Sequence, residues 1–281
     1  MPSFMPTLTR PLTLPRRARA ARLIVFSLEV FSIAVFAVPG FTGPAFAEPT
    51  EITVRVLGKD SKFVGTSMGG ARVILRDAET GEILAKGVTA GSTGDTEKIM
   101  HEDRGARAVL SSKGSAHFTA TLDLDAPRLI EAEAYGPLAQ AQAANRASAT
   151  QWVVPGAHIT GGDGWVLELP GYVVDVLDPP AHVKLPPDTT NVDLRANVAL
   201  MCGCPITPGG LWDADKLTVK ALVTRNGEKL APVDLVFAGQ TSQFKGSVPV
   251  FGAGVYDVTV YAHSPETGNT GLDRTTFIVA E

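Results

Sequence analysis

The chain has 281 residues, with 25 Lys and Arg against 29 Asp and Glu and only two cysteines. This acidic balance argues against nucleic acid and anionic lipid as partners, because both require clustered basic side chains. The two cysteines are separated by a single glycine, which excludes a scaffold held together by long-range disulfides.

The first 47 residues have the order of parts of a secretory signal peptide. Five arginines precede an apolar stretch over residues 23–38, and Ala45-Phe46-Ala47 is a small-x-small cleavage pattern. The apolar stretch is shorter than the roughly 20 residues of a spanning helix, so we expect no membrane insertion after cleavage. Export by the Sec or the twin-arginine route remains open. Residues 48–281 then carry 20 basic and 28 acidic residues, a net charge of −8, and are expected to be periplasmic or secreted.

Alternation of apolar and polar residues with period 2 recurs between residues 51 and 169 and is typical of half-buried strands. The predicted strands cover residues 51–57, 71–77, 82–85, 116–122, 130–134, 150–154 and 165–169. Residues 91–105 are polar and Gly-rich and predict a long loop. Long loops on rigid scaffolds are candidate binding surfaces.

Residues 69–89, GGARVILRDAETGEILAKGVT, resemble the opening strands of carboxypeptidase-regulatory-like and transthyretin-like β-sandwiches. In those families a V-x-L-x-D strand leads through a Thr-Gly turn into a returning strand. The resemblance implies a β-sandwich over residues 48–170.

A second unit is predicted for residues 171–281, with seven strands. Val192 to Leu200 is the longest clean alternation of the chain, and Asn226-Gly227 predicts a hairpin turn. Residues 254–269, GVYDVTVYAHSPETGN, resemble the final hairpin of bacterial immunoglobulin-like domains. That resemblance places Tyr256 at the tyrosine-corner position and residues 275–279 in the closing strand. The predicted fold is all-β, with two tandem β-sandwiches of prealbumin-like and immunoglobulin-like type after a signal peptide.

The sharpest local feature is Met201-Cys202-Gly203-Cys204-Pro205. The alternation that ends at Leu200 puts Cys202 in phase with the core face. Three readings stay open: a soft-metal site for Cu(I) with two thiolates and the Met201 thioether, a strained redox pair, and two inert buried thiols or a disulfide clip of the loop.

Two other sequence features give weaker indications of function. Gly65-Thr66-Ser67-Met68-Gly69 matches a G-x-S-x-G nucleophile elbow, but a predicted strand follows it where an elbow requires a helix. Trp152, Trp165 and Trp212 would form a carbohydrate platform if exposed, although Trp165 lies in a strand pattern and is expected in the core.

From these patterns we expect a non-enzymatic binding or accessory protein. Copper held by Cys202, Cys204 and Met201 is the sharper hypothesis, with delivery to another exported or membrane protein. Alternatives are thiol–disulfide exchange by the cysteine pair, a small ligand bound by the loops at 91–105 and 201–215, and a purely structural or adhesion module.

Overall fold

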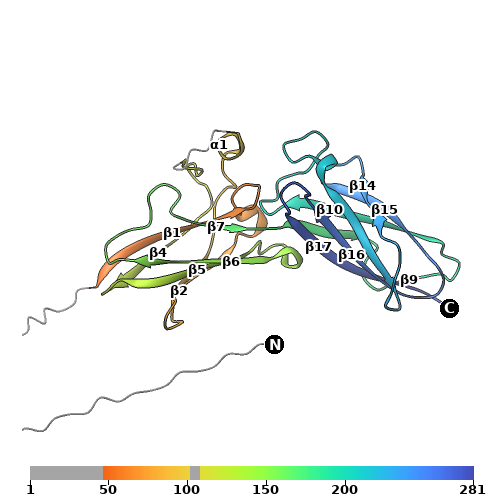
Figure 1. Cartoon of the computed structure of the whole chain (residues 1–281), viewed down its shortest axis with the longest axis horizontal. Coiled ribbons are helices and arrows are strands. Elements are labelled where there is room, and N and C mark those ends of the chain that lie inside the picture. Colours follow the sequence, from red (N-terminus) through yellow and green to blue (C-terminus); the bar gives the residue numbers. More distant parts are fainter. Residues whose placement is uncertain (1–46, 102–107) are drawn as a thin grey trace, which may run out of the picture. The chain divides into compact units, whose positions relative to one another are not determined.

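The computed structural model describes residues 47–101 and 108–281, and the predicted signal peptide therefore lies outside the described residues apart from its last position. The described residues all belong to one compact unit. Figure 1 shows that this unit is built almost entirely of strands, as the sequence predicts. Among the described residues, no helix is long and apolar enough to cross a bilayer.

Two sheets from the first half of the chain pack face to face around one core, which makes a β-sandwich. One sheet has the order β4-β1-β7 and the other β3-β2-β5-β6. Their bounds are β1 Glu48–Gly58, β2 Arg72–Asp77, β3 Ile83–Val88, β4 Phe118–Leu124, β5 Arg128–Gly136, β6 Asn145–Val153 and β7 Trp165–Leu169. The core between them takes the inward residues of both sheets, among them Ile52, Val54, Val73, Leu75, Ile130, Ala132 and Leu167.

Two further sheets come from the second half and enclose a second core. Their orders are β14-β15-β10-β8 and β12-β11-β16-β17-β9, with β13 paired to β11. The bounds are β8 Tyr172–Asp178, β9 Val183–Leu185, β10 Asn191–Leu200, β11 Thr218–Arg225, β12 Glu228–Lys229, β13 Val233–Asp234, β14 Val236–Phe237, β15 Gln243–Pro249, β16 Gly254–His263 and β17 Thr270–Val279. Every second residue of β10 from Val192 to Leu200 is buried, which confirms the predicted alternation.

The second half contains ten strands where the sequence predicts seven. The three additional ones are β9, β12 and β13, and each is only two or three residues long. Segments that short contain no full period of alternation, so a pattern search passes over them. They extend the edges of the two sheets and do not alter the sandwich.

The tyrosine corner predicted for Tyr256 is present. Its ring is fully buried and stacks on Phe277 with ring centroids 4.7 Å apart. Its hydroxyl accepts a hydrogen bond from the backbone N–H of Phe251 (3.0 Å) and donates to the carbonyl of Gly252 (2.9 Å). A buried tyrosine that returns its hydroxyl to backbone just upstream is the hallmark of immunoglobulin-like sandwiches.

The segment predicted as a loop over residues 91–105 contains a short helix, α1 (Thr96–Met100). Asp95 caps its N-terminus by accepting a hydrogen bond from the N–H of Lys98 (3.0 Å). Ile99 is fully buried in a small third cluster with Leu57, Phe63 and Ala116. One buried Ile within a polar stretch gives too little periodicity to reveal the helix, and the expectation of a simple loop was wrong for residues 96–100.

Candidate functional site

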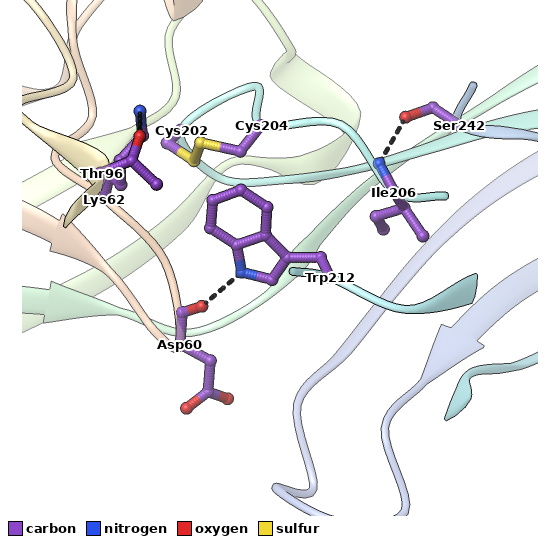
Figure 2. Close-up of a disulfide and its surroundings, with 8 residues drawn as sticks. All are labelled: Asp60, Lys62, Thr96, Cys202, Cys204, Ile206, Trp212 and Ser242. Carbon is purple, nitrogen blue, oxygen red and sulfur yellow. Dashed lines mark hydrogen bonds between the residues drawn. A yellow bond between two sulfur atoms is a disulfide. The ribbon is translucent and has the colours of Figure 1, made fainter. Parts of the chain in front are cut away.

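The Cys-Gly-Cys segment follows the end of β10 at Leu200 and turns back toward that strand. A disulfide joins Cys202 to Cys204 in the structure, with Cα atoms 5.3 Å apart. Hydrogen bonds from the N–H of Gly203 to the carbonyl of Leu200 (2.8 Å) and from the N–H of Leu200 to the carbonyl of Cys204 (3.2 Å) close the turn. Both cysteines are buried in the second core, as the phase of β10 predicts for Cys202. Figure 2 draws Trp212 among the residues around this bridge.

Met201 belongs to a different core from Cys202 and Cys204, which follow it in the turn. Its side chain is 1% exposed and packs in the core of the first sandwich. A Cβ on Gly171 would lie 2.6 Å from the Met201 methyl carbon, so a larger residue at position 171 would displace this side chain. Because the thioether and the two sulfurs point into separate cores, the structure does not bring the three predicted soft-metal ligands together.

Gly203 lies where the turn meets the first sandwich. It has a φ of +76°, a left-handed conformation that favours glycine. A Cβ at this position would meet the Met68 sulfur at 2.6 Å. The glycine between the cysteines therefore permits both the turn and the close approach of Met68 from the first sandwich.

Polar contacts hold the connection between the two sandwiches. Asn269 is 1% exposed; its Oδ1 accepts from the N–H of Gly171 (2.6 Å) and its Nδ2 donates to the carbonyl of Gly171 (3.1 Å). The N–H of Lys59 donates to the carbonyl of Leu169 within the first sandwich, and the Lys59 Nζ donates across to the carbonyl of Thr267 (2.9 Å). Asn269 thus satisfies both backbone groups of the residue at which one sandwich passes into the other.

Trp212 makes a further contact across this region. Its indole N–H donates to the carbonyl of Asp60 (2.8 Å), as Figure 2 shows. Asp60 itself has a φ of +55°, which is uncommon for a residue with a side chain. The ring packs against the core cluster that contains both cysteines. Trp165 is only 7% exposed in β7, and the indole N–H of Trp212 is already bonded to Asp60. Neither ring is therefore the exposed carbohydrate platform that the sequence suggested.

A cleft of about 280 Å³ opens beside Trp212. It draws its lining from both sandwiches: Asp60, Met100, Tyr172, Ile206, Leu211, Trp212, Asp213, Lys216, Leu217, Ser264, Glu266 and Thr267. The lining mixes an aromatic and aliphatic floor with three carboxylates and one lysine. Such a surface suits a small ligand with an apolar body and a positively charged group.

The titratable groups in the cleft have different surroundings, which shift two of their pKa values in opposite directions. Asp213 accepts hydrogen bonds from the N–H groups of Gly209 (2.8 Å) and Asp215 (3.0 Å), and these two donors lower the pKa of its carboxyl. Burial raises the pKa of the Tyr172 hydroxyl, against a hydrogen bond with Ser264, and the nearby Asp60 carboxylate raises it further. The carboxylates of Asp60 and Glu266 take part in no ion pair within the described residues.

The cleft has no metal-binding cluster among the residues that the structure describes. Within residues 47–101 and 108–281, no group of three or more His, Cys, Asp and Glu side chains is arranged to hold a metal ion. Gly65 to Gly69 forms a one-turn 3-10 helix over Thr66–Met68 and leads into strand β2. The strand that follows confirms that this segment is not a nucleophile elbow.

Both loops that the sequence predicts as binding surfaces contribute residues to the cleft. Residues 201–215 line the cleft and carry the disulfide, and Met100 reaches the cleft from α1. The contacts of Asn269 and Asp60 were not predicted, because each depends on a partner that is distant in sequence. The hairpin predicted over residues 254–269 was the one local pattern that placed a turn in this region.

Comparison with known proteins identifies no family for this chain. No family model matches the chain, and no curated protein matches it. Among solved structures, it is similar to fibronectin(III)-like modules of Clostridium thermocellum CbhA (12% identity, 75% of this chain and 78% of that chain, TM-score 0.27). It is also similar to the chicken interferon gamma receptor alpha chain (10% identity, 83% and 98%, TM-score 0.31). A third match is to an engineered protein (17% identity, TM-score 0.28). The matched region covers 46% of this chain but only 24% of the engineered protein.

Proposed function

We propose that this chain is an exported, non-enzymatic module of structural or adhesion type, which holds two β-sandwiches together as one mechanical unit in the periplasm or outside the cell. The observation that carries the proposal is the junction between the sandwiches, formed by Gly171, Met201 and Asn269. Met201 of the second half packs in the first core, and buried Asn269 binds both backbone groups of Gly171. A module that only tethered two independent domains would need neither contact.

The disulfide fits this role better than metal delivery or thiol exchange. Cys202 and Cys204 are 2% and 5% exposed, and a reagent or metal must reach a sulfur to act on it. The bridge closes the turn from which Met201 departs. We assign it a structural part, as a clip that fixes the turn at the junction.

Calorimetric unfolding of residues 48–281 tests the junction. We expect the protein to unfold in one cooperative transition, because breaking either sandwich disrupts contacts of the other. Asn269→Ala leaves the buried N–H and carbonyl of Gly171 without partners, which should cost about 2 kcal/mol of unfolding free energy and separate the transition into two. Asn191→Ala, on the exposed start of β10, is the matched control and should change neither quantity.

The proposal of one mechanical unit fails if the wild-type protein already shows two independent transitions. It also fails if Asn269→Ala and Asn191→Ala behave alike in the same experiment.

Ligand binding in the cleft is a second candidate function, favoured by its lining from both sandwiches. Asp60 and Glu266 have no ion-pair partner among the described residues, so an organic cation beside Trp212 would gain electrostatic and cation–π attraction. Agmatine is a suitable probe, and its binding should quench tryptophan fluorescence and weaken with added salt.

The Asp60→Asn/Glu266→Gln double variant should abolish this response. The matched control, Asp188→Asn/Glu228→Gln, neutralises two exposed carboxylates outside the cleft and should retain it. An equal response to the neutral sugar methyl glucoside would argue for a carbohydrate site and against a cation site.

A further inference from the structure

Strand β6 leaves one edge of the first sandwich open. It ends the sheet β3-β2-β5-β6, and β5 is the only strand that pairs with it in the described part of the chain. It has nine residues, more than any other edge strand that the structure describes. An unpaired strand edge of this length presents a row of free N–H and carbonyl groups to any extended chain.

The edge lacks the usual protection against such pairing. Natural edge strands are kept apart by charged residues, prolines, bulges or short length. The longer edges of this protein follow that rule, with Lys86 in β3, Asp123 in β4, Glu168 in β7 and Asp175 in β8. Residues 147–153 of β6, by contrast, contain neither a charge nor a proline and pair with β5 without a bulge.

The outward face of β6 is self-complementary in the antiparallel sense. Arg146, Ser148, Thr150 and Trp152 share this face, since they pair with Tyr135, Glu133, Glu131 and Leu129 of β5. A two-fold axis at Ala149 would place each Arg146 opposite the partner's Trp152 and each Ser148 opposite the partner's Thr150. Cross-strand pairs of these kinds are favourable: a guanidinium over an indole, and two hydroxyls within hydrogen-bonding distance.

The side chains at the two ends are available for these contacts. Trp152 is 61% exposed, and the Arg146 side chain is also 61% exposed while its guanidinium lies 3.4 Å from the Glu133 carboxylate. On the opposite face the strand carries Ala147 and Ala149, so no bulky side chain opposes its symmetry mate at the axis.

We propose that two copies of this chain pair through antiparallel β6 edges, centred on Ala149, and join their sheets into one continuous eight-stranded sheet. The second copy is the occupant that this edge fits, because the charge and the aromatic ring it requires are both supplied by the same strand. The cleft and the junction take no part in this contact.

Sedimentation of residues 48–281 over a range of concentrations tests the proposal, and we expect a reversible monomer–dimer equilibrium. Ala149→Lys places two like charges together at the axis and should leave only monomer. Ile83→Lys adds the same charge to the exposed edge strand β3 and should leave the dimer unchanged. Trp152→Leu removes both guanidinium–indole contacts and should weaken dimerisation by about tenfold.

The register is tested by Ala149→Cys, which should form a disulfide-linked dimer under mild oxidation, whereas Ile83→Cys should not. A wild-type protein that stays monomeric at all concentrations would overturn the proposal. So would a dimer that survives Ala149→Lys, or a dimer in which Ala149→Cys does not cross-link. The cross-link remains decisive if Ala149→Lys fails to fold.

Discussion

Asp77 shows how single side chains hold the turns between strands. Its carboxylate accepts hydrogen bonds from the N–H groups of Thr80 (2.8 Å) and Glu79 (2.9 Å) in the β2–β3 turn. The hydrogen bond from Thr80, against partial burial and helped by Glu79 and Arg128, lowers the pKa of the Asp77 carboxyl. The charged form is therefore bound more strongly in the folded protein than in the unfolded chain.

The sign of the pH dependence follows from this lowered pKa. As the pH falls, the unfolded chain takes up the proton first, so the stabilisation is complete above the ordinary carboxyl pKa and disappears as the pH falls through the lowered one. Asp77→Asn should lower the stability at neutral pH and flatten its decline in acid, measured by urea unfolding across that range. The exposed Asp188→Asn should keep the wild-type slope, and a slope unchanged in Asp77→Asn would contradict the assignment.

At the same scale, sequence alone locates a residue in a core more easily than it identifies its partner. The phase of β10 correctly predicts that Cys202 is buried. It does not predict that Met201 crosses into the first core, because alternation only assigns Met201 to the other side of the strand. The bonds from Asn269 to Gly171 connect residues 98 positions apart, and no local pattern encodes such a pair.

At the scale of elements, prediction succeeded where a strand is long and half-buried. The predicted strand 165–169 coincides with β7, and the predicted strand 192–200 differs from β10 by one residue. Asn226 and Gly227 both have positive φ angles, as their hairpin turn requires. Prediction failed for α1 and for β9, β12 and β13, which are stabilised by tertiary packing or by pairing with a long neighbour.

At the scale of the whole molecule, the turn at 201–204 links the two cores. Residues on this turn alternate between the sandwiches: Met201 enters the first core, and Cys202 and Cys204 enter the second. Met68 of the first sandwich approaches the turn at Gly203. The conformation of four residues thus bears on the packing of both halves, which is why a clip there affects more than its own loop.

The cysteine pair supplies the last prediction. Protein recovered from the exporting cell should have the mass of residues 48–281 less two hydrogens and should take up no alkylating reagent, since a disulfide leaves no free thiol. Cys202→Ala/Cys204→Ala releases the turn and should lower the free energy of unfolding by about 2 kcal/mol, as expected for a bridge that closes a very short loop. It should also make unfolding less cooperative, because Met201 is no longer held at the junction.

The reduced wild-type protein is the matched control for the double variant. Chemical reduction should bring the wild type to the stability of Cys202→Ala/Cys204→Ala and should leave the variant itself unchanged. Free thiols in the recovered protein, or a mass increased by a bound metal, would contradict the structural role and return soft-metal binding to first place. Equal stability and cooperativity in the oxidised, reduced and substituted proteins would show that the bridge does not support the junction.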